Sequence, residues 1–244
     1  MAGSLLLVAH GSRDPRHART VRALTRVIRS TRPGLRVRTA FLDFDAPGVT
    51  EELERAARDG IRSLVVQPLL LTRAFHAKTD LPGVLRQAPP ALAVRQAPVL
   101  GPDPLLTAAL ERRLYGAGLA PGERAGTGVV LAAAGSGDPE AAETLAALAR
   151  HWQHTAGWYA VRPAAASGGP RTEDVVRALR AEGARRVAVA PYVLAPGRLP
   201  DRIAAGARAA GADVLAPVLG AAPELVRLVL RRYDRAARTP APTG

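Results

Sequence analysis

An internal repeat constrains the fold of this chain more than any other feature of its sequence. Residues 6–15, an apolar run followed by Gly-Ser-Arg-Asp-Pro, return as residues 129–139, an apolar run followed by Gly-Ser-Gly-Asp-Pro. Two further pairs of segments recur in the same order and at similar offsets: 62–71 with 185–194, and 97–101 with 216–220. A twofold repeat of whole-domain length predicts two similar lobes and not a solenoid of many short units.

Each repeat alternates short apolar runs with longer amphipathic stretches. Strands that alternate with helices in this way form βαβ units with parallel pairing. The sequence therefore predicts an α/β fold of two similar lobes, each a parallel four-stranded sheet flanked by helices. In the first repeat we expect strands at 5–9, 36–43, 63–71 and 93–99, and helices at 15–30, 47–59, 78–87 and 104–115.

The predicted domain borders follow from the spacing of the repeat. The first lobe spans residues 1–117 and the second spans residues 128–236. Residues 118–127 lie in a Gly- and Pro-rich stretch and are expected to form a linker. Residues 237–244 are expected to be a frayed tail. A chain of 244 residues is long enough for two domains, each with its own core.

Cysteine content and hydropathy exclude several classes of protein. The chain has no Cys, so any metal ion must be held by His and carboxylate side chains. No apolar run approaches the roughly 18 residues that cross a bilayer. The apolar run at the start is too short for a signal peptide and indicates a buried strand. We therefore expect a cytoplasmic protein that has no membrane partner.

The formal net charge of +13 raises the question of nucleic-acid binding. Nearly all basic residues are Arg, with Lys78 the only Lys, and they are scattered over Ala-rich stretches. With three Phe, four Tyr and two Trp, no aromatic platform for stacked bases is visible. We expect Arg to fill solvated helix faces in a monomer without a nucleic-acid partner. A positive field that concentrates a polyanionic small substrate is a third interpretation.

Two histidines fall at the edge of the first predicted sheet. His10 directly follows the first strand, and His76 lies in the loop after the third. Ligands of parallel α/β proteins sit beyond the carboxyl ends of the strands. Neutral imidazole binds first-row metal ions and can accept a proton near neutral pH. One such His alone is equally well explained as a polar residue bonded to the backbone, but the pair predicts a shared metal ion.

The second repeat provides an internal test of this prediction. Ala134 stands where His10 would be, and either Arg198 or Leu199 stands opposite His76. If the histidines were part of the scaffold, a similar scaffold would need them twice. Their joint absence favours a single asymmetric site, and greater divergence of the second lobe is the alternative explanation.

Two carboxylates, Asp43 and Asp45, end the second predicted strand at the same edge. One can act as a third metal ligand or a proton acceptor, and the other can cap the helix that begins near Pro47. Because Asp45 is closer to that helix, we assign Asp43 to the chemistry and Asp45 to capping.

The turn at residues 11–15 has neither the G-x-G-x-x-G spacing nor the Lys of a nucleotide-binding loop. Asp14 and Pro15 are explained as the N-cap and the first residue of the following helix. Ser12 and Arg13 are expected to line the mouth of the site beside His10.

The remaining histidines are not expected to bind metal. His151 and His154 are three residues apart on a helical stretch, but no third ligand accompanies them, so they are expected at the surface or an interface. His17 lies between Arg16 and Arg19 and is expected to be exposed. A Ser hydrolase is disfavoured because no G-x-S-x-G motif occurs.

In several segments the chain resembles the sirohydrochlorin chelatases, class II chelatases of tetrapyrrole synthesis, in their long two-lobe form. The resemblance covers nearly the whole chain and rests on Val-Ala-His-Gly-Ser-Arg-Asp-Pro at 8–15, Ala-Phe-Leu-Asp at 40–43, and Gln-Pro-Leu-Leu-Leu at 67–71 leading to Phe-His-Ala-Lys-Thr-Asp-Leu-Pro at 75–82. It implies a lyase that inserts a divalent metal ion into sirohydrochlorin without ATP or an organic cofactor. Fe²⁺, which gives sirohaem, is favoured. A cobalt or nickel chelatase of the cobalamin type and a non-catalytic metal or tetrapyrrole carrier are the alternatives.

The resemblance also implies roles for individual residues. The two site histidines of the family correspond to His10 and His76, and its acidic residue, usually Glu, corresponds to Asp43, which is one methylene shorter. The second lobe would supply no metal ligand. Guanidinium groups pair bidentately with carboxylates such as those of the substrate. The residues expected to bind the substrate are Ser12, Arg13, Arg73, Phe75 and Lys78, with Phe75 packing on the ring.

Overall fold

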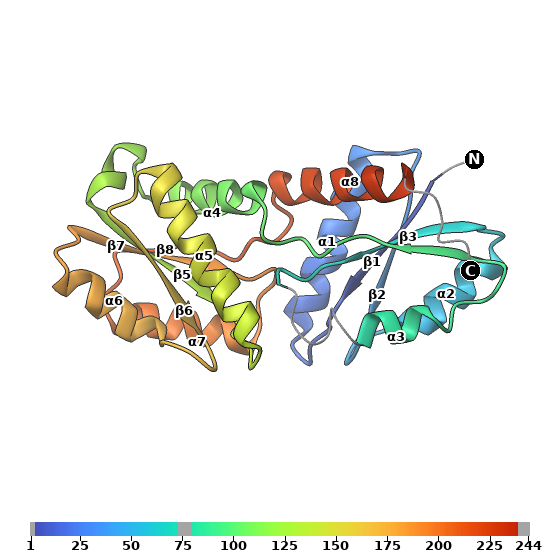
Figure 1. The fold of residues 1–244 in the computed structure, drawn as a ribbon, viewed down its shortest axis with the longest axis horizontal. Coiled ribbons are helices and arrows are strands. Elements are labelled where there is room, and N and C mark those ends of the chain that lie inside the picture. Colours follow the sequence, from blue (N-terminus) through green and yellow to red (C-terminus); the bar gives the residue numbers. More distant parts are fainter. Residues whose placement is uncertain (1–2, 73–79, 239–244) are drawn as a thin grey trace. The chain divides into compact units, whose positions relative to one another are not determined.

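The computed structural model describes residues 3–72 and 80–238 as two units, each built on one sheet (Figure 1). Unit 1 comprises residues 1–101 and 220–244, and unit 2 comprises residues 102–219. Both sheets have four strands, and all strand pairs are parallel. The predicted α/β fold of two similar lobes is therefore confirmed.

The sheet of unit 1 has the order β2-β1-β3-β4, which places the first strand of the chain in its centre. Strand β1 is completely buried, because helices cover both faces of the sheet, and this explains its continuous apolar sequence. The strands are β1 (Ser4–Ala9), β2 (Arg36–Phe41), β3 (Ser63–Pro68) and β4 (Ala93–Gln96).

Alternate residues of β1 enter the cores on the two sides of this sheet. Leu6 and Val8 join a cluster with Leu53 of α2 and Leu81 of α3. Helices α1 and α8 contact each other and the strands β2, β3 and β4. The helices of unit 1 are α1 (Pro15–Thr31), α2 (Val49–Arg58), α3 (Leu81–Leu85) and α8 (Pro223–Arg238).

Unit 2 repeats this architecture, with the strand order β6-β5-β7-β8. Val130 and Val189 of the central strands pack with Val176 of α6 and Ile203 of α7 in one core cluster. Helices α4 and α5 contact β7 and β6 respectively. The strands are β5 (Thr127–Ala133), β6 (Ala160–Ala165), β7 (Arg186–Tyr192) and β8 (Val214–Leu215). The helices are α4 (Pro104–Gly116), α5 (Pro139–Ala156), α6 (Thr172–Ala181) and α7 (Arg198–Ala209), with a short 3-10 helix at Pro121–Gly126.

The compact units differ from the predicted domains because the repeats exchange their last helices. Helix α4 lies in the first repeat but packs on β7 of unit 2, and α8 lies in the second repeat but packs on β3 and β4 of unit 1. The predicted borders at 117 and 128 follow the repeat along the sequence. In space, each sheet is covered by a helix that the other repeat supplies.

Several predicted element bounds also differ from the structure. Strands β2, β3 and β4 end at 41, 68 and 96, earlier than predicted, although Leu69 still donates a backbone hydrogen bond to Val8. The predicted linker 118–127 contains the 3-10 helix and the first residue of β5. Helix α8 continues to Arg238, and the rest of the predicted tail, residues 239–244, lies outside the described residues.

Candidate functional site

A tight turn at the carboxyl end of β1 holds His10 against the end of β2. The backbone N–H of Asp43 donates to the carbonyl of His10 at 2.9 Å, so the two segments stay paired beyond the regular strands. Gly11 has φ +96°, and a Cβ atom there would overlap the carbonyl oxygen of Asp43. Only Gly permits both the positive φ and this close approach. The Gly that follows His10 is therefore required by the geometry of the site.

Asp45 stabilises this turn and does not cap a helix, so the capping role predicted for it is wrong. Its Oδ2 accepts a hydrogen bond from the backbone N–H of Ser12 at 2.9 Å, across 33 residues of sequence. Helix α2 instead has Gly48 as its N-cap, without a side-chain hydrogen bond. Asp43 Oδ1 accepts from the backbone N–H of Phe44 at 2.8 Å. Both carboxylates therefore help to fix the backbone around His10.

The predicted N-cap of the first helix is confirmed. Asp14 Oδ1 accepts from the backbone N–H of Arg16 at 2.9 Å, and Pro15 is the first helical residue. The hydrogen bonds that the side chain and the backbone N–H of Arg16 donate lower the pKa of Asp14 to about 2. Ser12 Oγ accepts from the backbone N–H of Asp14 at 3.1 Å, which ties the helix start to the turn.

Phe44 is part of this site, although no role was predicted for it from the sequence. Its ring lies edge-on to the imidazole of His10, with ring centroids 6.1 Å apart and planes at 87°. The guanidinium of Arg13 lies over the Phe44 ring, 5.3 Å from its centroid. The signal in the sequence was an aromatic residue between two aspartates at a strand end, in a chain with only three Phe.

His17, in the first turn of α1, is half-buried, so the prediction that it is exposed is wrong. Its ring lies 6.4 Å from that of Phe41, and its Nδ1 is buried without a hydrogen-bond partner in the part of the chain that the structure describes. Burial lowers the pKa of His17. The nearby charges of Asp45 and Asp14 raise this pKa and partly oppose the effect of burial, whereas the charge of His10 lowers it further. His17 therefore favours the neutral imidazole close to the site.

Four of the predicted site residues, Arg73, Phe75, His76 and Lys78, lie outside the described residues. The pairing of His10 with His76 is thus a prediction still to be tested. Within residues 3–72 and 80–238, no group of three or more His, Cys, Asp or Glu side chains is arranged to hold a metal ion.

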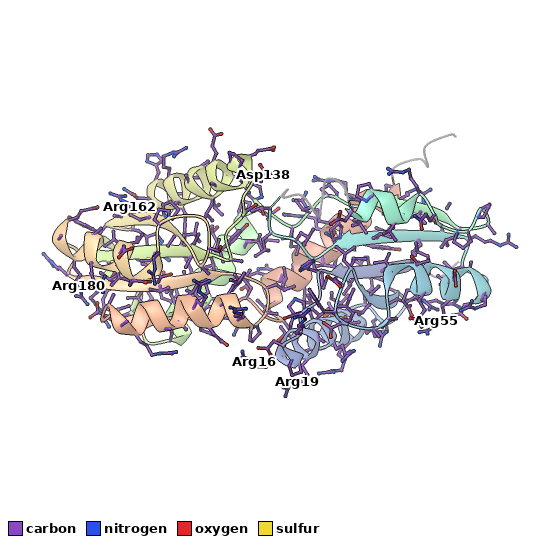
Figure 2. All side chains as sticks on the ribbon, turned by 90° about the horizontal axis from the view of Figure 1, so that it is seen from below. Arg16, Arg19, Arg55, Asp138, Arg162 and Arg180 are labelled. Carbon is purple, nitrogen blue, oxygen red and sulfur yellow. The ribbon has the colours of Figure 1, made fainter. Side chains whose placement is uncertain are left out.

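Unit 2 contains the same turn without the chemically active side chains. Gly135 has φ +97°, and a Cβ atom there would overlap the carbonyl oxygen of Ser167. Ser136 Oγ accepts from the backbone N–H of Asp138 at 3.0 Å, and Asp138 caps α5 (Figure 2). Ala134 and Ser167 thus occupy the positions of His10 and Asp43. The scaffold is retained in both units, whereas the imidazole and carboxylate occur only in unit 1.

The histidines of α5 belong to a surface, as predicted. His151 and His154 are both exposed, and no metal-binding group among the described residues includes them. Trp152 between them is 1% exposed. Its Nε1–H donates to Glu111 of α4 at 2.8 Å, which explains how a buried indole satisfies its donor.

The arginines lie mainly on the surface, where Arg55, Arg162 and Arg180 project outward (Figure 2). A groove of about 750 Å³ runs beside the edge strand β2, and among its lining residues are Arg22, Arg26, Arg29, Arg36, Arg38 and Arg55. Neither His10 nor Asp43 lines this groove, so the groove is separate from the turn that presents His10. No helix within the described ranges is long and apolar enough to cross a membrane.

Comparison with known proteins gives consistent matches over both repeats. The model of the CbiX family matches residues 4–117 and 128–236. A sirohydrochlorin cobaltochelatase of Priestia megaterium is 28% identical over 210 residues, which cover 82% of this chain and 67% of that protein. A sirohydrochlorin ferrochelatase of Bacillus subtilis is 27% identical over 207 residues, which cover 83% and 78% respectively.

Solved structures extend the similarity to the fold. SirB from Bacillus subtilis with Fe³⁺ superposes with a TM-score of 0.85 at 24% identity and covers 98% of this chain and 96% of that one. CbiX, described as the terminal enzyme of sirohaem biosynthesis in denitrifying bacteria, gives a TM-score of 0.73 at 23% identity, with 96% and 99% covered. The two-unit architecture is therefore shared with both proteins.

Proposed function

Since this chain belongs to the CbiX family, we propose that it is a sirohydrochlorin chelatase, a lyase that inserts a divalent metal ion into sirohydrochlorin without ATP. The observation that carries this proposal is the family match over both repeats. It is supported by the turn that presents His10 in unit 1 and its counterpart Ala134 in unit 2, since a single catalytic centre needs only one such imidazole.

The metal ion is a substrate in this proposal, and we favour Fe²⁺, with Co²⁺ or Ni²⁺ as alternatives. One of the two relatives is named for cobalt and the other for iron, although both resemble this chain equally well. Nitrogen and oxygen ligands bind divalent ions in the same general order in most proteins. The metal supply of the cell is therefore expected to decide between these ions.

We assign metal delivery to His10 and His76. Two neutral imidazoles would hold the ion from one side and leave its other coordination positions open, as a site that passes its metal on requires. Insertion exchanges two pyrrolic protons for the metal ion, so the site needs a proton acceptor. Asp43 is our candidate for that role, because its backbone pairs with that of His10 and its exposed side chain can reach solvent.

Substrate binding is assigned to Ser12, Arg13, Arg73, Phe75 and Lys78. Sirohydrochlorin is a polycarboxylate, and guanidinium and ammonium groups bind carboxylates through charge-assisted hydrogen bonds. Arg13 is exposed and lies two residues after Gly11, beside His10. The positive charge of the chain would also raise the local concentration of such an anion.

Anaerobic mixing of the protein with sirohydrochlorin and one metal ion at a time tests this function. Metal insertion changes the absorbance spectrum of the macrocycle, and the rate should exceed that of a protein-free control with at least one of Fe²⁺, Co²⁺ and Ni²⁺. A rate equal to the control with all three ions, together with binding of sirohydrochlorin, would support a carrier instead of an enzyme.

The expectations for partners and location are part of the same proposal. We propose that the chain acts as a monomer in the cytoplasm, without a nucleic-acid or membrane partner. Light scattering tests the monomer, and a tight DNA shift that weakens steeply with salt would contradict the absence of nucleic-acid binding.

A further inference from the structure

Phe44 has an exposed side chain that the fold does not need. It is 52% exposed and, within the described residues, is the most exposed of three large hydrophobic side chains at the surface, the others being Tyr159 and Val27. Phe41, three residues earlier, is 1% exposed and packs in the core. Burial therefore explains Phe41 but gives no reason for a large apolar side chain at position 44.

The backbone of Phe44 is also held in an unfavourable conformation. Its φ is +62°, and among the residues that the structure describes it is the only non-Gly residue with a positive φ. A bulky residue in the left-handed region costs free energy and persists only where its surroundings enforce it. Here Asp43 Oδ1 accepts from the Phe44 backbone N–H, and Asp45 on the other side bonds to Ser12. The loop thus fixes an aromatic residue where Gly would be easier to accommodate.

The surroundings of the ring indicate what it can bind. His10 lies edge-on to it at 6.1 Å, and the Arg13 guanidinium lies over it at 5.3 Å. An aromatic surface beside a cation suits a ligand that is flat and apolar in the middle and anionic at its rim. The nearby imidazole of His10 would then face the centre of such a ligand.

We propose that Phe44 is a substrate-binding residue whose ring packs on the macrocycle of sirohydrochlorin while Arg13, held against that ring, pairs with a peripheral carboxylate. This inference rests on the proposed function and extends it to a residue that cannot ligate metal or transfer a proton. Phe44 should therefore affect the binding of the tetrapyrrole and leave the binding of the metal ion unchanged. The stacking of nucleic-acid bases on aromatic side chains is a precedent for this contact between a protein ring and a flat, conjugated ligand.

Titration of metal-free sirohydrochlorin into the full chain tests this proposal. Phe44→Ala should raise the dissociation constant on the order of tenfold, the size of one aromatic stacking contact. Phe44→Trp should stay within about twofold of wild type, because it restores an aromatic surface. Tyr159→Ala is the matched control, since Tyr159 is an exposed aromatic residue of unit 2, and it should bind as wild type does.

Two further measurements distinguish substrate binding by Phe44 from a positioning role toward His10 and from a general loss of stability. Co²⁺ binding by Phe44→Ala should equal that of wild type, and a parallel loss of metal affinity would overturn the proposal in favour of a positioning role toward His10. Phe44→Gly should unfold at the same temperature as wild type or higher, because Gly relieves the positive φ, yet bind sirohydrochlorin as weakly as Phe44→Ala. Wild-type affinity in Phe44→Ala would refute the inference alone, whereas a wild-type chain that does not bind sirohydrochlorin would refute the proposed function as well.

Discussion

Replacing Gly11 by Ala should disrupt the turn that presents His10, and the repeat supplies a matched control. Gly11 and Gly135 have nearly the same φ, +96° and +97°, and in both cases a Cβ atom would overlap a backbone carbonyl. Gly11→Ala and Gly135→Ala therefore impose the same local change on the two units. Only the first change lies beside the residues assigned to the chemistry.

The expected cost can be worked out from two contributions. An L-residue in the left-handed region costs about 1–2 kcal/mol. Relief of the overlap moves Asp43 and weakens its 2.9 Å hydrogen bond to His10, which contributes about 1 kcal/mol. The free energy of unfolding should thus fall by about 2–3 kcal/mol, which is a substantial part of the roughly 5–15 kcal/mol typical of folded proteins. At Gly135 the left-handed conformation has the same cost, and the overlap is with the carbonyl oxygen of Ser167, so a loss of at least about 1–2 kcal/mol is expected there.

Urea denaturation and the anaerobic insertion assay together test this reasoning. Both variants should lose similar stability, but only Gly11→Ala should lose turnover, by on the order of a hundredfold, because a shift of about 1 Å at reacting groups has that effect. An equal loss of turnover in Gly135→Ala would contradict the single site in unit 1. Wild-type stability in Gly11→Ala would refute the geometric argument itself.

Two further predictions concern stability. Burial lowers the pKa of His17, so the unfolded chain binds a proton at this imidazole more readily than the folded chain does. The contribution of neutral His17 to stability should therefore be complete above about pH 6.5 and be lost as the pH falls from there toward the lowered pKa. His17→Asn should make unfolding less pH-dependent between pH 7 and 5 than in wild type, and identical slopes would contradict this origin. Glu111 accepts from Trp152 Nε1 and from Arg124, both at 2.8 Å, so Glu111→Ala should lower the free energy of unfolding by about 1–3 kcal/mol while the insertion rate per folded molecule stays unchanged. A loss of rate without a loss of stability would show that unit 2 takes part in the chemistry.

Local patterns in the sequence predicted the features that depend on neighbouring residues. The alternation of apolar and amphipathic segments indicated parallel sheets, and Asp14 with Pro15 marked the start of α1. The repeat also predicted that Ala134 takes the place of His10. The turns at Gly11 and Gly135, which directly follow these two residues, have the same backbone conformation and support this correspondence.

The features that sequence reasoning missed depend on contacts between distant segments. Helices α4 and α8 have apolar faces, but such a face does not specify which sheet it covers, so their exchange between units was not predicted. Asp45 was assigned to the nearest helix, whereas its partner Ser12 is 33 residues away.

The helical spacing of His17 indicated that its side chain is partly buried, although it was predicted to be exposed. His17 precedes Val21, Leu24 and Ile28 by four, seven and eleven residues, and all three are buried on the inner face of α1. Such spacing places His17 on the same side of the helix. Its charged neighbours suggested exposure, but helical periodicity was the better guide.

The central claim is that one imidazole site in the first unit inserts the metal ion, and substitution of single histidines tests it most directly. Under anaerobic conditions, His10→Ala and His76→Ala should each lower the rate of metal insertion by on the order of a hundredfold or more, since even residues that only support a metal ligand contribute 10–100-fold. Both variants should remain folded, and His151→Ala, at an exposed position on α5, should insert metal at the wild-type rate. Wild-type rates in both His10→Ala and His76→Ala would contradict the account.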